Sequence, residues 1–84
     1  MDIIGWRSVV AGVLAEKVGI LSDVVIDETL EEMGLSEDKM EIRLLGIFMK
    51  HLYGRLPDDI DRRQCLYEIR DSLMKEYHLL LARN

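Results

Sequence analysis

The longest run of apolar side chains at helical spacing lies between Ser36 and Pro57. Serine is a preferred N-cap residue, acidic residues follow Ser36 in the first turn, and Pro57 cannot continue a helix. The apolar side chains cover about half of the helix circumference, which is wider than the stripe of an ordinary surface helix. They are Ile42, Leu44, Leu45, Phe48, Met49, Leu52, Tyr53 and Leu56. This pattern predicts a central helix at about 37–55 that packs against neighbours on two sides.

Residues 3–18 show the i, i+3, i+4, i+7 spacing of an amphipathic helix. The apolar side chains are Ile3, Ile4, Trp6, Val9, Val10, Val13, Leu14 and Val18. Small residues form a narrow seam on the opposite side of this predicted helix, namely Gly5, Ser8, Gly12, Ala15 and Gly19. Such a seam either faces water or allows a neighbouring helix or a second subunit to approach closely.

Residues 20–33 predict a second amphipathic helix. The inward face comprises Val25, Ile26, Thr29, Leu30 and Met33, and the outward face carries Asp23, Asp27, Glu28, Glu31 and Glu32. Gly34 follows where a left-handed residue beyond the helix end is expected. Leu35 then supplies the hydrophobic contact of a Schellman motif. The helix is therefore predicted to end at this glycine.

Residues 59–81 predict the last helix, which follows a compact turn at Leu56-Pro57-Asp58-Asp59. Its core stripe comprises Leu66, Ile69, Leu73, Tyr77 and Leu80. A second stripe repeats at heptad spacing and comprises Ile60, Tyr67, Met74 and Leu81. The second stripe is either a broader contact with the core or a seam for another chain.

Short connections between these elements predict that consecutive helices are antiparallel neighbours. The expected fold is a single all-α domain over residues 1–84, a four-helix antiparallel up-down bundle with short loops and with helices at about 3–18, 20–33, 37–55 and 59–81. A hydrophobic content of 49% over 84 residues is typical of a folded domain with a small core. No apolar window reaches the roughly 18 residues of a membrane span, and no export signal is visible. We therefore expect a cytoplasmic protein that does not bind membranes.

The charge of the chain is strongly uneven. The formal net charge is −5, which disfavours binding to nucleic acids or acidic lipids because both are anionic. Between residues 23 and 41 the acids are Asp23, Asp27, Glu28, Glu31, Glu32, Glu37, Asp38 and Glu41, against a single base, Lys39. An acidic patch of this kind steers a basic partner by its long-range field. The basic edge formed by Lys39, Arg43 and Lys50 is expected to pair with the acids of the helix at 20–33 or to frame a partner site.

The chain predicts no catalytic, cofactor or metal site, so we expect a protein that is not an enzyme. Neither His51 nor His78 stands three residues after a glutamate, as the histidines of di-iron bundles do. Cys65 is the only cysteine and has no partner for an internal disulfide, and it is expected to be a small buried residue. Motifs of phosphate-binding loops, dinucleotide-binding folds, zinc proteases and serine hydrolases are absent.

The stretch from Leu14 to Ile69 resembles small helical modules appended to bacterial signalling proteins, including serine/threonine kinases, response regulators and proteins linked to roadblock domains and small GTPases. Gly19-Ile20-Leu21-Ser22-Asp23-Val24-Val25 corresponds to the G-P-I-A-x-x-[LV]-V helix start of these modules. Leu56-Pro57-Asp58-Asp59, with Arg62 and Leu66, corresponds to their I/L-P-D-x-x-x-R-x-x-F helix. This chain departs from the pattern because it lacks the proline after Gly19 and the final phenylalanine. The resemblance implies a regulatory or docking role and supplies no active-site residues.

We therefore predict a non-catalytic protein–protein interaction or regulatory module of bacterial signalling. It would dock a protein partner, expected to be basic, through an acidic and apolar helical face. The predicted contact residues are Asp23, Val24, Asp27, Glu28, Glu31, Tyr67 and Met74. Val24 is the apolar side chain among these acids. The alternative is a structural homodimer that uses the small-residue seam or the heptad stripe.

Overall fold

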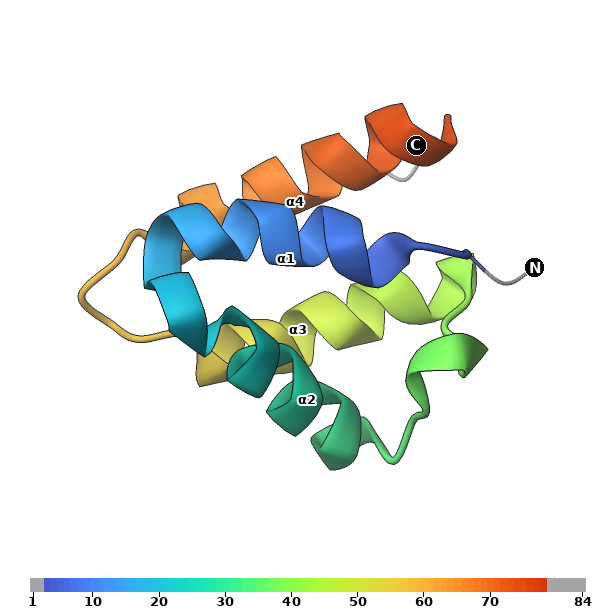
Figure 1. Cartoon of the computed structure of the whole chain (residues 1–84), viewed down its shortest axis with the longest axis horizontal. Helices are drawn as coiled ribbons and strands as arrows, with labels where there is room; N and C mark the ends of the chain where they lie inside the picture. The colour runs from blue at the N-terminus through green and yellow to red at the C-terminus, as the bar shows by residue number, and fades with distance from the viewer. Residues whose placement is uncertain (1–2, 79–84) are drawn as a thin grey trace.

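The computed structural model describes residues 3–78, which form an all-helical fold without β-strands (Figure 1). The α-helices are α1 (Trp6–Val18), α2 (Ser22–Met33), α3 (Leu45–Arg55) and α4 (Arg62–Tyr77). Short 3₁₀ helices η1 (Gly19–Leu21), η2 (Glu37–Lys39) and η3 (Ile42–Leu44) lie between them. The all-α prediction is thus confirmed for the described residues. None of their helices is long and apolar enough to cross a membrane.

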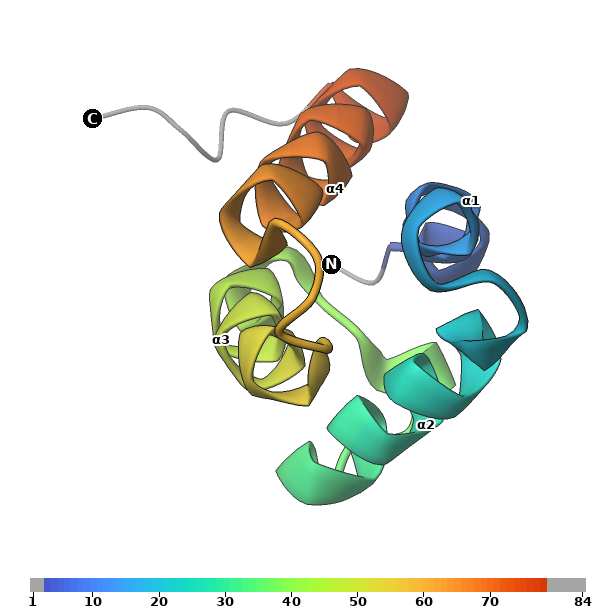
Figure 2. The same cartoon turned by 90° about the vertical axis from the view of Figure 1, so that its left-hand side faces the viewer.

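The predicted four-helix antiparallel up-down bundle with short loops is wrong. The helices do not share one axis, because α2 runs obliquely beneath α1 and α3 (Figure 1). Seen at right angles, α1 and α3 point nearly towards the viewer whereas α2 and α4 lie obliquely (Figure 2). The connection between α2 and α3 is also long, since it takes all of residues 34–44 and contains η2 and η3. The fold is therefore an irregular helical assembly in which α1 packs on α4 and α2 packs on α3.

The predicted helix at 37–55 is replaced by η2, η3 and the shorter α3. Met40 is extended (φ −66°, ψ 133°) and its side chain is almost fully buried. Its carbonyl accepts a hydrogen bond from the Ile3 amide, and the carbonyl of Glu37 accepts one from the Trp6 indole. In a continuous helix both carbonyls would be taken by amides four residues later. Contacts with the N-terminal segment thus outweigh the local helix signal that begins at Ser36.

The other helix boundaries shift by a few residues. The helix predicted at 3–18 begins at Trp6, and the start of the one predicted at 20–33 is divided between η1 and α2. The last helix begins after Asp61, whose carboxylate accepts a hydrogen bond from the Gln64 amide, and not at Asp59. It ends at Tyr77, because His78 is left-handed (φ 55°). The predicted continuation to Leu81 lies outside the described residues.

The predicted Schellman motif at the end of α2 is confirmed. Gly34 is left-handed (φ 64°), and its amide donates to the carbonyl of Glu31. The Leu35 amide donates to the carbonyl of Leu30 at 3.0 Å. These two bonds satisfy backbone carbonyls that the helix end would otherwise leave unpaired.

The core gathers one face of each α-helix together with Ile3 before α1, Met40 between η2 and η3, and Leu56 after α3. Its buried apolar side chains are Ile3, Trp6, Val10, Leu14, Val25, Ile26, Leu30, Met40, Leu45, Phe48, Leu52, Leu56, Cys65, Ile69 and Leu73. The rings of Trp6 and Phe48 pack edge to face at a centroid distance of 5.1 Å, which joins α1 to α3. At the other side of α1, the Tyr77 hydroxyl donates to the carbonyl of Ile4 at 2.7 Å. Both ends of the described chain are therefore fastened to the same end of the molecule.

Candidate interaction surfaces

The predicted contact residues of α2 share its solvent-facing side. Asp23, Val24, Asp27, Glu28 and Glu31 are all exposed, and Val24 retains 49% of its accessible surface. The opposite side of the helix buries Val25, Ile26, Thr29 and Leu30, as its periodicity predicts. The helix therefore presents the predicted acidic and apolar face to solvent.

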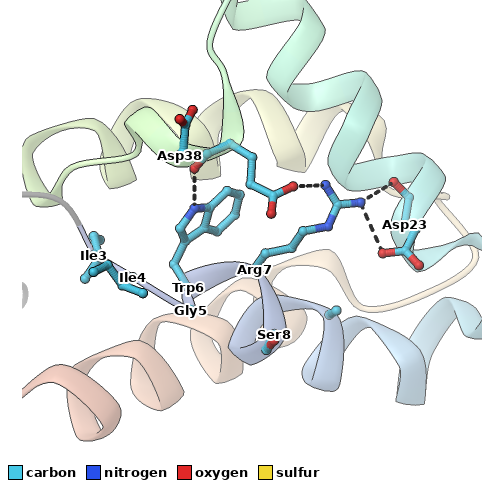
Figure 3. A pocket seen from close by; sticks show the side chains of 10 residues that line it. Ile3, Ile4, Gly5, Trp6, Arg7, Ser8, Asp23 and Asp38 are labelled. Carbon is cyan, nitrogen blue, oxygen red and sulfur yellow. Dashed lines mark hydrogen bonds and ion pairs between the residues drawn. The ribbon is translucent and has the colours of Figure 1, made fainter.

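Arg7 of α1 holds part of this acidic face. Its guanidinium bonds the carboxylates of Asp27 (2.8 Å), Asp23 (3.1 Å) and Glu37 (2.8 Å), as Figure 3 shows for Asp23. The side chain of Arg7 is only 21% exposed, so its aliphatic part is shielded while its head reaches the acids. The hydrogen bond with Asp27, followed by those with Asp23 and Glu37, raises the pKa of Arg7 above its ordinary value. One cation thus ties α1, α2 and η2 together.

A second set of contacts joins the far end of α2 to α3. Arg55 approaches Glu28 at 3.5 Å and Glu32 at 3.4 Å, and the His51 ring lies 2.8 Å from Glu32. The hydrogen bond with His51, and then the charge of Arg55, lower the pKa of Glu32. These residues take the place of the expected basic edge, because Arg43 pairs with Glu41 instead. The acids of α2 are therefore countered mainly from α1 and from the end of α3.

Glu31 differs from its acidic neighbours. In the part of the chain that the structure describes, its carboxylate forms no ion pair or hydrogen bond, whereas those of Asp23, Asp27 and Glu28 each meet an arginine. The acidic face is thus partly neutralised near its ends and retains an uncompensated carboxylate at Glu31. A carboxylate in this state is available to a cation from another molecule.

The corner between α1 and α2 exposes two large apolar residues that the sequence pattern did not single out. Ile20 is 97% exposed and Leu21 is 52% exposed, and both precede Val24 by about one helical turn. Together, Ile20, Leu21 and Val24 form what we call the corner patch. The spacing of these three residues is visible in the sequence. The helical pattern alone does not show that η1 turns Ile20 and Leu21 away from the core.

The predicted residues of α4 lie apart from α2. Tyr67 is 60% exposed and Met74 is half-buried, and both line a small hollow with Arg70 and Asp71. Figure 2 shows α4 across the molecule from α2, with α1 and α3 between them. The seven predicted contact residues thus belong to two separate surfaces.

A larger cleft lies beside Arg7 at the start of α1. It measures about 560 Å³, and its lining residues are Ile3, Ile4, Gly5, Trp6, Arg7, Ser8, Ala11, Asp23, Glu37 and Asp38 (Figure 3). The Arg7 guanidinium in its wall is already held by three carboxylates. The guanidinium of Arg7 is consequently not free to bind an anionic ligand in this cleft.

The residues with potential chemistry do not converge. His51 faces Glu32 on the side of α3, while His78 follows the end of α4 and is exposed. Cys65 is fully buried, as expected, and its burial raises the pKa of the thiol. Across residues 3–78, no group of three or more His, Cys, Asp or Glu side chains is placed to hold a metal ion.

The small-residue seam of α1 faces solvent. Gly5, Ser8, Gly12, Ala15 and Gly19 are all exposed. A Cβ atom placed on Gly12 would meet no other heavy atom of the described chain within 4 Å. Within one molecule, the seam therefore faces water and no neighbouring helix packs closely against it. Its use by a second subunit stays a prediction.

Comparison with protein-family models, with curated proteins and with solved structures finds no match for this chain. The resemblance to bacterial signalling modules therefore stays a prediction. The geometry of the described residues is the basis for the functional inference.

Proposed function

We propose that this chain is a non-catalytic protein-interaction module that binds a protein partner through the solvent-facing side of α2. The observation that carries the proposal is the corner patch, where Ile20, Leu21 and Val24 expose 97%, 52% and 49% of their surfaces beside acidic residues. Neighbouring apolar side chains left in water are a mark of an interaction site, whereas single exposed ones are common on any protein.

The chemistry around the corner patch defines the partner. Burial of the three apolar side chains supplies the attraction, and Glu31 supplies a free carboxylate two turns beyond Val24. The expected partner therefore offers an apolar hollow bordered by lysine or arginine. Charge of this kind chiefly sets the rate and specificity of association.

The resemblance of residues 14–69 to helical modules of kinases, response regulators and roadblock-linked proteins supports a role in bacterial signalling. In such a role the module would act in the cytoplasm and regulate by docking. The burial of Cys65 leaves its thiol inaccessible to a substrate, which supports a function without cysteine-based catalysis.

Affinity capture with a matched pair of variants tests the proposal. Val24→Arg with Glu31→Arg reverses the apolar and charged character of the α2 surface and leaves the acids bound by Arg7 in place. The control is Ile47→Arg with Glu76→Arg, because Ile47 is 51% exposed and Glu76 is also exposed. Both double variants add the same residues and the same charge.

The expected result is a protein that the wild type and the control capture from native extract and that the α2 variant does not. Far-UV circular dichroism checks that both variants are folded. Equal capture by the two variants would exclude the α2 surface as the docking site.

A further inference from the structure

A groove between α3 and α4 is a second surface with distinctive chemistry. It measures about 240 Å³ and is lined by Met49, Tyr53, Arg63, Leu66, Tyr67 and Arg70. Tyr53 and Tyr67 are 39% and 60% exposed. Tyrosine, methionine and arginine are the residue types enriched at protein interfaces, because they combine large contact areas with polar ends.

The two arginines of this groove lack anionic partners. No carboxylate lines the groove, and neither Arg63 nor Arg70 forms an ion pair with any residue between 3 and 78. The neighbouring Arg62 lies over the Tyr53 ring at 5.2 Å, which adds a further positive charge at the rim. Burying an unpaired arginine is costly, so an occupant of the groove must supply carboxylates together with apolar side chains.

The solvent-facing side of α2 has this complementary chemistry. The corner patch supplies Ile20, Leu21 and Val24, and Glu31 supplies a carboxylate with no partner in the described chain. Glu28 is held only loosely, at 3.5 Å from Arg55. An acidic, apolar helix face and a basic, apolar groove therefore occur on one molecule.

The two surfaces of one molecule cannot meet. The buried side of α2, with Val25, Ile26 and Leu30, packs towards the core and α3, so its solvent-facing side points away from the groove between α3 and α4. We infer that the solvent-facing side of α2 in one copy docks into the α3–α4 groove of a second copy. This inference rests on the proposed docking function of α2 and names its partner as another molecule of this chain.

Contact between two different surfaces has a consequence for symmetry. A two-fold dimer pairs a surface with itself, whereas a head-to-tail contact leaves one free surface at each end. Each added copy then offers the same free groove and the same free α2. Self-association is therefore expected to continue beyond the dimer, into open chains or closed rings.

Sedimentation velocity of the full chain over a range of concentrations tests this. The wild type is expected to form species larger than dimers as concentration rises. A monomer at every concentration, or a dimer that does not grow, would overturn the head-to-tail contact.

A complementation experiment with two variants tests which surfaces meet. The α2 variant is Val24→Arg with Glu31→Arg, and the groove variant is Arg63→Ala with Arg70→Ala, so the two altered surfaces do not attract each other. Each alone is expected to weaken self-association by at least about tenfold, because each destroys one half of the contact. Mixed together, they should form dimers and stop there, since only one intact α2 and one intact groove remain per pair.

The controls separate this inference from a folding defect and from the proposed function. Ile47→Arg with Glu76→Arg should self-associate like the wild type, and circular dichroism verifies that each variant is folded. If one of these variants does not fold, the mixing experiment is repeated with the milder substitutions Glu31→Gln and Arg70→Gln.

Self-association that survives in the α2 variant would overturn the inference. A monomeric wild type that still captures another protein through α2 would overturn it too, while leaving the proposed function intact.

Discussion

Trp6 donates its indole Nε1 hydrogen to the backbone carbonyl of Glu37, at 2.9 Å and across 31 positions of sequence. The same ring packs against Phe48 in the core. The indole therefore combines apolar burial with a fixed polar contact, and it anchors η2 to the start of α1. Without this contact, the long connection between α2 and α3 would lose one of its attachments to the N-terminal segment, beside those of Arg7 to Glu37 and of Ile3 to Met40.

Replacing Trp6 with phenylalanine should lower the free energy of unfolding by about 1–3 kcal/mol. The loss has two causes, since the carbonyl of Glu37 loses its donor and the smaller ring leaves unfilled space. Urea unfolding followed by far-UV circular dichroism measures it. Tyr67→Phe is the control and should change stability by less than about 0.5 kcal/mol, because Tyr67 is 60% exposed. Equal effects of the two substitutions would contradict the anchoring role of the indole.

Removing the guanidinium of Arg7 should destabilise the fold more than removing any surface arginine. Arg7→Ala leaves Asp23, Asp27 and Glu37 close together without their shared cation. We expect the free energy of unfolding to fall by about 1–2 kcal/mol. This is near the low end of what hydrogen bonds between charged groups contribute, because the three acids are exposed to water. Arg43→Ala is the control, since Arg43 is 74% exposed and forms its ion pair with Glu41; it should cost under about 0.5 kcal/mol. The difference in urea midpoint between the two variants is the measurement.

Two glycines should respond to alanine in opposite directions. Gly12 lies inside α1 with open space around it, so Gly12→Ala should stabilise the chain by about 0.5–1 kcal/mol. Gly34 is left-handed, so Gly34→Ala should destabilise it by about 1 kcal/mol or more. Thermal unfolding of both variants compares them. A loss of self-association in Gly12→Ala would favour the alternative homodimer that uses the small-residue seam.

The fold should weaken below about pH 4.5, partly through Glu32. The pKa of Glu32 in the folded chain is lowered from 4.5 by its hydrogen bond with His51 and the charge of Arg55. A lowered pKa means that the ionised form stabilises the fold above pH 4.5, and that this contribution is lost as pH falls through the folded pKa. Urea unfolding at a series of pH values should show this decline. Glu68 adds to the decline in the same direction, because Gln64 and Lys17 lower its pKa.

Glu32→Gln should make the decline of the free energy of unfolding below about pH 4.5 shallower. Glu31→Gln provides the matched control, since Glu31 has no ion pair within the described chain. A profile for Glu32→Gln that matches the wild type would show that the contact with His51 contributes nothing to the fold in solution.

Local signals in the sequence predicted the features that depend on a few neighbouring residues. The end of α2 follows from Gly34 and Leu35, and its buried side follows from the spacing of Ile26 and Leu30. The burial of Cys65 was likewise expected, because a lone cysteine without a partner or an activating group is typically a small buried residue. These features require only the conformation of one segment and its division into two faces.

Contacts between distant segments could not be predicted in this way. Arg7 meets Asp23 and Glu37 over separations of 16 and 30 positions, and no period in the sequence links them. The late start of α3 has the same origin, because the carbonyls of residues 37 and 40 bond to the N-terminal segment instead of continuing a helix. The α3–α4 groove also depends on how two helices cross. Sequence periodicity shows which side of a helix is apolar, but not which partner covers it.

The hydrogen bond from Tyr77 to Ile4 brings the entry and the exit of the described chain together. A domain whose two ends lie close together can replace a surface loop of another protein without moving the elements on either side of that loop apart. Residues 3–78 are therefore suited to insertion between two strands or helices of another protein, or to circular permutation with a short linker. A permutant opened at the exposed turn 57–59 should keep the helical circular dichroism spectrum of the parent chain.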